Sequence, residues 1–194
     1  MTAPAFAYLI RHGQTSWSLS GQHTGLTDLP LTLEGEAAAR RLGERLQGHA
    51  FALVLTSPLQ RAVRTCELAG FGGLVESDPD LVEWNYGRYE GMTTAEIRAD
   101  NPSWDLFLEG CPDGESPATI AERADRIVAQ IRRANGDVLL FSSGHFLRVL
   151  AARWCGLNVT FARHLLLETG TLSVLAYGHD DHREPAVKSW NQSS

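Results

Sequence analysis

Runs of apolar, β-branched and aromatic residues of strand length alternate along this chain with segments of helical periodicity. Strands and helices that alternate in sequence assemble into a mostly parallel sheet with helices packed on it. The alternation therefore predicts an α/β fold, a three-layer α/β/α sandwich with a mostly parallel sheet. The predicted strands are Phe6–Ile10, Phe51–Thr56, Val138–Ser142 and Leu172–Tyr177.

The clearest helix is expected over Pro117–Ala134, where apolar residues recur at intervals of three and four. Ser116 is a typical N-cap residue, proline is favoured at the first helical position, and Gly136 follows the end of the pattern. The capping-box pair Thr93 and Glu96 predicts a short additional helix. Three further helices are expected over Leu33–Gln47, from Pro58 onward after Ser57, and over about His145–Cys155.

The length of 194 residues favours one domain, because domains commonly contain roughly 100–200 residues. No linker rich in proline, glycine or serine divides the chain, and its composition does not change abruptly. Residues 1–194 are therefore predicted to form a single domain. Within it, the segment Asp78–Glu115 carries signals for short helices and loops, and we expect this insertion to act as a partial lid over the sheet.

The charge balance limits the possible partners. The chain has 17 Lys and Arg residues against 23 Asp and Glu residues, which gives a formal net charge of −6. Such a chain has no global positive field, so neither nucleic acid nor a membrane surface is an expected partner. An anionic ligand would need a local basic pocket. The sequence does not specify an oligomeric state.

Cysteine usage and apolar runs favour a cytoplasmic localisation. Cys66, Cys111 and Cys155 lie far apart and form no C-x-x-C pair, so neither a common zinc spacing nor a dense disulfide framework is indicated. The apolar stretch Ala5–Ile10 is too short for a signal peptide and is followed at once by Arg11. No run approaches the roughly 20 apolar residues of a membrane span.

Three predicted strands end directly before a cationic or imidazole side chain. They lead into Arg11–His12–Gly13, into Ser57–Arg61, and into Ser143–Arg148. Ligands of open α/β sheets bind beyond the carboxyl ends of the strands, so the three segments would converge if their strands are neighbours. Arginine matches phosphate oxygens with a planar fork, and helix N-termini offer free N–H groups to the same anion. A lone arginine would be an ordinary surface residue, but this combination favours an anion site.

His12 has the chemistry of a nucleophile, because a neutral imidazole nitrogen can attack phosphorus while flanking arginines neutralise the transferring oxygens. Gly13 would leave the approach to it open. The alternative for an isolated histidine at this position is a structural core residue that caps the end of a strand.

These residues belong to a longer series of motifs that resembles the histidine phosphatase family, which includes the cofactor-dependent phosphoglycerate mutases. The resemblance covers almost the whole chain, and its phosphatase branch contains sedoheptulose bisphosphatase and broad acid phosphatases. It implies a phosphoglycerate mutase-like fold. The motifs are Arg11–Thr15, Trp17–Asp28, Ser57–Ala62 with Thr65, Leu81-x-Glu83, Glu83–Gly87, Glu90–Gly91 and Gly110–Glu115.

The resemblance implies a role for several residues. His12 would be the phosphohistidine nucleophile, Arg11 and Arg61 the phosphate clamp, and Glu83 the general acid and base. The family needs no metal, and a phosphatase of this branch needs no cofactor. The positions that would line the phosphate pocket are Ser18, Thr24 and Gly25.

The chain departs from the family at the last motif, which usually reads His-Gly-x-x-Leu-Arg. Ser143 stands where the second histidine belongs, followed by Gly144, while His145 matches a neighbouring pocket position. All three are predicted substrate-binding residues. The phosphate pocket is therefore expected either to lack one imidazole or to receive it from His145.

The sequence is interpreted as that of a metal-independent phosphomonoesterase that hydrolyses a small phosphorylated metabolite through a phosphohistidine. One alternative is a phosphoglycerate mutase, which requires a bisphosphorylated cofactor. The other is a phospho-ligand binding module with weakened catalysis, made plausible by Ser143. A separate pattern, His179-x-x-His182, could hold a metal, but a solvated turn is the favoured interpretation.

Overall fold

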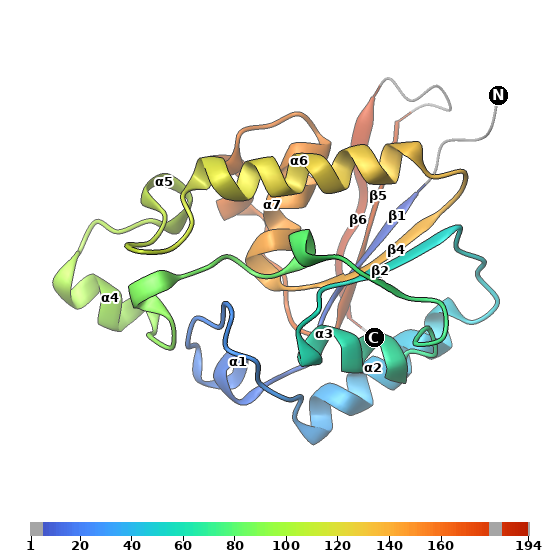
Figure 1. The fold of residues 1–194 in the computed structure, drawn as a ribbon, viewed down its shortest axis with the longest axis horizontal. Coiled ribbons are helices and arrows are strands. Elements are labelled where there is room, and N and C mark those ends of the chain that lie inside the picture. The colour runs from blue at the N-terminus through green and yellow to red at the C-terminus, as the bar shows by residue number, and fades with distance from the viewer. Residues whose placement is uncertain (1–5, 179–183, 194) are drawn as a thin grey trace.

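The computed structural model describes residues 6–178 and 184–193. Over these residues the chain forms a six-stranded sheet with the order β3-β2-β4-β1-β5-β6 (Figure 1). The pairs β1–β4, β2–β4 and β2–β3 are parallel, whereas β5 runs antiparallel to both β1 and β6. The strands are β1 (Ala7–Arg11), β2 (Leu53–Thr56), β3 (Glu76–Ser77), β4 (Val138–Ser142), β5 (Thr171–Tyr177) and β6 (Pro185–Ser193).

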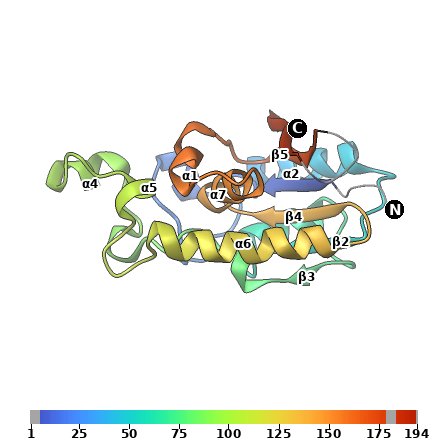
Figure 2. The same cartoon turned by 90° about the horizontal axis from the view of Figure 1, so that it is seen from above.

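Helices cover both faces of the sheet and complete the predicted three-layer sandwich (Figures 1 and 2). Helices α2 and α3 pack on one face, and α6 and α7 pack on the other. The α-helices are α1 (Ser16–Ser20), α2 (Leu33–Leu46), α3 (Gln60–Leu68), α4 (Thr94–Asp100), α5 (Leu106–Glu109), α6 (Pro117–Arg133) and α7 (Gly144–Trp154). Short 3₁₀ helices are η1 (Pro79–Leu81), η2 (Gly87–Tyr89) and η3 (Val159–His164).

The central strand β4 divides the core, because successive side chains of a strand point to opposite faces of the sheet. Leu139 and Phe141 belong to the apolar cluster beneath α2 and α3. Val138 and Leu140 belong to the larger cluster beneath α6 and α7. All four are fully buried. Covering both faces explains why this strand is apolar at consecutive positions and is recognisable in the sequence.

The predicted strands and helices are confirmed to within two residues at their ends. Two strands were missed. The first, β3, has only two residues, and the second, β6, is a half-exposed edge strand with polar positions on both sides. An edge strand that is only partly buried does not need the apolar pattern on which strand prediction depends.

Helix α3 begins at Gln60 rather than at Pro58, and its N-cap is Leu59, which supplies no side-chain hydrogen bond. The expectation that Ser57 starts this helix is therefore wrong. Its hydroxyl accepts only a long bond from the Leu59 N–H, at 3.4 Å. The Gln60 N–H instead donates to the Asp28 carboxylate at 2.8 Å, so a residue distant in sequence caps the helix.

Segment 78–115 connects β3 to α6 and contains η1, η2, α4 and α5. Figure 1 shows α4 and α5 beyond one end of the sheet, with α5 next to the start of α6. Trp84, Tyr86 and Phe107 from this segment are buried in the apolar cluster beneath α6 and α7. The segment is also tied to the loop that follows α1, where the His23 N–H donates to Met92 O at 2.8 Å.

Candidate active site

The strand ends singled out in the sequence lie side by side. In the parallel pair of β1 and β4, Arg11 is opposite Ser142, and β2 lies on the other side of β4. The His12 N–H donates to Ser142 O at 3.0 Å, and the Ser57 N–H donates to Phe141 O at 2.9 Å. The three segments that follow these strands therefore meet at one edge of the sheet.

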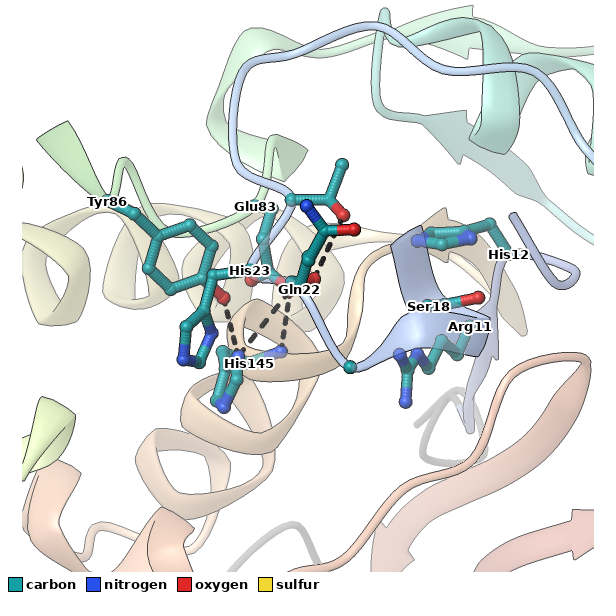
Figure 3. A pocket seen from close by; sticks show the side chains of 10 residues that line it. Arg11, His12, Ser18, Gln22, His23, Glu83, Tyr86 and His145 are labelled. Atoms are coloured by element: carbon teal, nitrogen blue, oxygen red, sulfur yellow. Dashed lines mark hydrogen bonds and ion pairs between the residues drawn. The ribbon is translucent and has the colours of Figure 1, made fainter. Parts of the chain in front are cut away.

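A cavity of about 170 Å³ opens at this edge. Six of the ten predicted site residues line it, together with four others. The lining residues are Arg11, His12, Ser18, Gly21, Gln22, His23, Thr24, Glu83, Tyr86 and His145 (Figure 3). The predicted residues outside this lining are Gly25, Arg61, Ser143 and Gly144, all of which are buried.

His12 is 4 % exposed and has a fixed tautomer. Its Nδ1 donates to the Gly13 carbonyl oxygen at 2.8 Å, which leaves Nε2 as the nitrogen with a free lone pair. Burial, and then the charges of Arg61 and Arg11, lower the pKa of His12 well below its ordinary value of 6.5. The imidazole is therefore neutral at physiological pH, as a nucleophile must be.

Gly13 has a different role from the one expected. A Cβ at this position would lie 2.4 Å from Gly35 O, so the missing side chain permits close packing of the loop after β1 against α2. The contact is reciprocal, because a Cβ on Gly35 would lie 2.3 Å from Gln14 O. The Gly13 N–H donates to the hydroxyl of Thr65 in α3 at 3.0 Å. Backbone contacts with two helices thus fix the position of His12.

Arg11 lines the cavity, and its Nε is available as a hydrogen-bond donor. Its Nη1 donates to the Leu167 carbonyl, whereas its buried Nε has no hydrogen-bond partner within residues 6–178 and 184–193. A Cβ on Gly144 would lie 3.1 Å from Nε and Cζ, so this glycine allows the guanidinium to pack against the start of α7.

Arg61 is fully buried and holds the loop between α1 and α2. Its guanidinium donates to the carbonyls of Thr27 at 2.9 Å, Gly25 at 2.7 Å and Thr24 at 3.2 Å. Burial lowers the pKa of Arg61, and the charge of Glu83 opposes this shift. An arginine remains protonated even so, and Arg61 places a permanent positive charge close to His12.

Glu83 is 4 % exposed, and its carboxylate caps helix α7. Its Oε1 accepts from the N–H groups of Trp84 at 2.9 Å and Phe146 at 2.8 Å. Its Oε2 accepts from the His145 N–H at 2.9 Å and lies 3.9 Å from the Nδ1 of that residue. Since a carboxylate oxygen offers two lone-pair sites, Oε2 keeps one of them for a further contact.

Ser143 does not replace an imidazole in the cavity. It is 1 % exposed, it lies outside the cavity lining, and its hydroxyl has no hydrogen-bond partner in the described part of the chain. His145 does line the cavity, with Nδ1 2.6 Å from the Tyr86 hydroxyl. Figure 3 places His145, Tyr86 and His23 together at the end of the cavity away from His12. The cavity thus has the imidazole of His12 at one end and those of His23 and His145 at the other.

The loop after β1 supplies the remaining predicted positions. Ser18 lines the cavity and also belongs to the capping box of α1, in which the Thr15 N–H donates to its hydroxyl at 2.9 Å. Thr24 lines the cavity as well. Gly25 lies behind it, and its N–H donates to Glu90 at 2.8 Å. A Cβ on Gly25 would lie 2.6 Å from Trp84 O, so this glycine is required by packing.

Gln22, His23 and Tyr86 line the cavity but were not among the predicted site residues. The sequence placed all three inside recognised motifs, yet a motif does not show which way a side chain points. Gln22 pairs with Thr93 in an isolated bridge, and its Nε2 donates to Gly91 O at 2.7 Å. These contacts join segments about seventy residues apart, so no local pattern encodes them.

A buried ion pair supports the backbone at Glu83. The Arg123 guanidinium contacts both carboxylate oxygens of Glu115, at 2.7 and 2.8 Å. It also donates to the carbonyls of Asp80, Val82 and Glu83. Arg123 therefore fixes the segment that carries Glu83, although it lies on α6 and does not line the cavity.

Within residues 6–178 and 184–193, no group of three or more His, Cys, Asp or Glu side chains is arranged to hold a metal ion. His179 and His182, considered above as a metal pattern, lie outside the described residues. None of the helices in the described ranges has the length and apolar content to span a bilayer. The three cysteines are free thiols.

Comparison with known proteins identifies relatives along nearly the whole chain. The profile of the Histidine phosphatase superfamily (branch 1) matches residues 7–193. An acid phosphatase of Mycobacterium tuberculosis is 38 % identical, and the match covers 88 % of this chain and 86 % of the relative. Sedoheptulose 1,7-bisphosphatase of Saccharomyces cerevisiae is 34 % identical, with 93 % and 90 % covered.

Solved structures agree with these sequence matches. A Mycobacterium tuberculosis protein known by its open reading frame superposes with a TM-score of 0.91 at 34 % identity, and 97 % of this chain and 98 % of that one are covered. A mycobacterial glucosyl-3-phosphoglycerate phosphatase gives a TM-score of 0.83 at 26 % identity, with 97 % and 99 % covered. The chain is therefore a phosphatase that belongs to the histidine phosphatase superfamily, branch 1.

Proposed function

We propose that this phosphatase is a metal-independent phosphomonoesterase that hydrolyses a small phosphorylated metabolite through a phosphohistidine on His12. The observation that carries this proposal is the state of His12: it is neutral, buried and held in one tautomer, with the charges of Arg61 and Arg11 acting on it. A structural core histidine would not need a free Nε2 beside a cavity.

In the proposed first step, His12 Nε2 attacks the phosphorus of the ester while the bond to the leaving oxygen breaks. Negative charge then accumulates on the three remaining phosphoryl oxygens. The guanidinium of Arg11 and the positive charge of Arg61 stabilise it in a site shielded from water. The unpaired Nε of Arg11 is a donor that such an oxygen could satisfy.

Glu83 is proposed to move the proton in both steps. Its Oε2 donates a proton to the leaving oxygen, and the resulting carboxylate then removes a proton from the water that attacks the phosphohistidine. The second step releases phosphate and returns His12 and Glu83 to their starting states. Its position supports this role, since Glu83 lines the same cavity as His12 and Oε2 retains a free lone-pair site.

We further propose that segment 78–115 covers the cavity as a partial lid within a single domain. It contributes Glu83 and Tyr86 to the cavity lining and is tied to the loop carrying Gln22 and His23. Residues of the lid and of that loop form the end of the cavity away from His12. The structure of the leaving group would therefore be recognised there, while the phosphoryl group lies beside His12 and Arg11.

The test is to trap the intermediate. Enzyme denatured during turnover of p-nitrophenyl phosphate should carry an acid-labile phosphate on His12, detected by mass spectrometry. His12→Ala should lack this phosphate, and its kcat should fall toward the rate constant of uncatalysed hydrolysis. His164→Ala, a change at an exposed histidine outside the cavity, serves as the matched control. Hydrolysis by His12→Ala at the parent rate would refute the mechanism.

A further inference from the structure

A second cavity, of about 200 Å³, lies next to the active-site cavity. His23 and His145 line both cavities and form the wall between them. Their ring centroids are 5.9 Å apart. The second cavity is bounded by residues of the lid segment and by residues of α7 and η3. It therefore lies at the end of the active site where the leaving group is expected.

Three arginines line the second cavity: Arg98 from α4, Arg148 from α7 and Arg163 from η3. Asp105 is the acidic residue in the lining, and it lies 2.9 Å from Arg163 Nη2. The local formal charge is thus positive, in a chain whose overall charge is −6. This is the local basic pocket that an anionic group would need in an acidic protein.

The arginines keep donors available for a ligand. Arg98 is an exposed residue that donates from its Nε to Trp104 O at 3.2 Å, which leaves its two terminal nitrogens for contact with a ligand. The buried Nε of Arg163 is without an acceptor in the described ranges. A buried donor without an acceptor destabilises a protein, so an acceptor in this cavity would be favourable.

Arg148 has a structural role in addition to its charge. It donates to the carbonyls of Ala162 at 3.0 Å and Arg163 at 3.2 Å, and its guanidinium lies 4.8 Å from the centre of the Phe107 ring. These contacts fix the position of the Arg148 guanidinium in the cavity lining. Because a substitution of Arg148 would also remove them, it could not separate loss of charge from loss of structure.

The wall between the cavities is uncharged at physiological pH. Burial lowers the pKa of His23 to about 4, and the pKa of His145 lies well below its ordinary value for the same reason. The site therefore has two separate positive centres, at Arg11 with Arg61 and at Arg98 with Arg163, with neutral rings between them. A ligand with two anionic groups on one skeleton matches this arrangement.

We propose that the second cavity binds a second anionic group, a phosphate or a carboxylate, of the substrate whose first phosphate is cleaved at His12. The inference rests on the proposed function for the position of the first phosphate. It names a substrate class: small metabolites with a phosphomonoester at one end and an anion at the other. Arg98 and Arg163 would then determine specificity without taking part in the chemistry.

The experiment compares substrates that differ only in the distal group. Alkanediol monophosphates, α,ω-bisphosphates and ω-phosphocarboxylates of several chain lengths are hydrolysed by the parent enzyme, by Arg98→Gln and by Arg98→Glu. At one chain length, the parent should show a higher kcat/KM for a doubly anionic substrate than for the monophosphate. The two substrate series distinguish a phosphate from a carboxylate. Arg98→Gln should reduce this preference about tenfold, the effect of one charge-assisted hydrogen bond, and Arg98→Glu should reduce it further.

The matched control is Arg88→Gln. Arg88 is an exposed arginine of the same segment, paired with Asp113 and outside both cavities. It should keep the parent preference. A parent enzyme with no preference for doubly anionic substrates would overturn the inference. So would equal losses of preference in Arg98→Gln and Arg88→Gln.

Binding measured without turnover separates this inference from the proposed function. Calorimetric titration with an alkane bisphosphonate and the matching monophosphonate should show tighter binding of the bisphosphonate, and Arg98→Gln should remove the difference. If p-nitrophenyl phosphate is not hydrolysed but this difference is found, the proposed function fails and the second anion site stands. If p-nitrophenyl phosphate is hydrolysed and no difference is found, the second site fails alone.

Discussion

The N-termini of helices α3 and α7 lie at the same edge of the sheet, and each receives a carboxylate from a distant segment. At α3 the acceptor is Asp28, which binds the Gln60 N–H on the exposed side of the molecule. At α7 it is Glu83, which binds the N–H groups of His145 and Phe146 and is almost fully buried. Neither helix has a side-chain hydrogen bond from its own N-cap residue.

The difference lies in what each carboxylate faces. Asp28 also accepts from the Gln60 side chain at 2.7 Å, through its backbone carbonyl, and thereby closes the loop whose carbonyls bind Arg61. Glu83 lines the cavity that contains His12. The same favourable interaction between a helix N-terminus and an anion thus fixes a loop in one place and, in the other, a carboxylate proposed to transfer protons.

The largest expected difference between the two carboxylates is in catalysis, and it is tested by neutralising each of them in turn. Glu83→Gln should lower kcat/KM for an alkyl phosphate by about 10²–10⁴-fold, because proton transfer to the leaving oxygen is lost. Asp28→Asn, the same change at α3, should cost less than about tenfold. Steady-state kinetics on both variants decide the point. The Glu83→Gln loss should shrink for p-nitrophenyl phosphate, whose leaving group needs little protonation, and an equal loss on both substrates would indicate a structural role.

The missing imidazole at the start of α7 provides the next prediction. Ser143→His should raise kcat by about tenfold or more, because an imidazole donor there can stabilise the phosphoryl oxygens. His145→Ala should change kcat for p-nitrophenyl phosphate less than about threefold, since His145 lies with Tyr86 at the other end of the cavity. The opposite pattern, a loss near 10²-fold in His145→Ala, would mean that His145 supplies the imidazole. Melting temperatures show whether the larger side chain is tolerated.

The smallest effect concerns stability at α3. Asp28→Ala removes the acceptor of the Gln60 N–H and should lower the free energy of unfolding by about 1 kcal/mol, typical of a lost cap. For a domain of this size that corresponds to a fall of roughly 2–4 °C in Tm. Asp125→Ala, which removes an exposed ion pair with Arg153, is the control and should change Tm less. A Tm equal to that of the parent would show that Asp28 does not act as a cap.

The layers of the fold and the location of the candidate site could be predicted from the sequence. Strands covered on both faces are apolar at consecutive positions, and polar residues at their carboxyl ends are easily recognised, as with Arg11 and His12. The remote helix caps could not be predicted, because Asp28 and Glu83 are separated from their helices by stretches that carry no local signal. The role of Gly13 was misjudged for the same reason, since its neighbour Gly35 is distant in sequence.

The contact between Gly13 and Gly35 has a consequence for how this enzyme can diversify. Beside His12, the proposed nucleophile, the two glycines bring backbone against backbone, and any side chain at either glycine would displace the loop that carries His12. At the opposite end of the cavity, the walls are the side chains of residues such as Gln22, His23 and Tyr86, so a substitution there changes the cavity lining itself. Under the proposed function, the second region contacts the leaving group and the first carries the reaction, so an engineer seeking a new substrate should randomise the second region and leave the first intact.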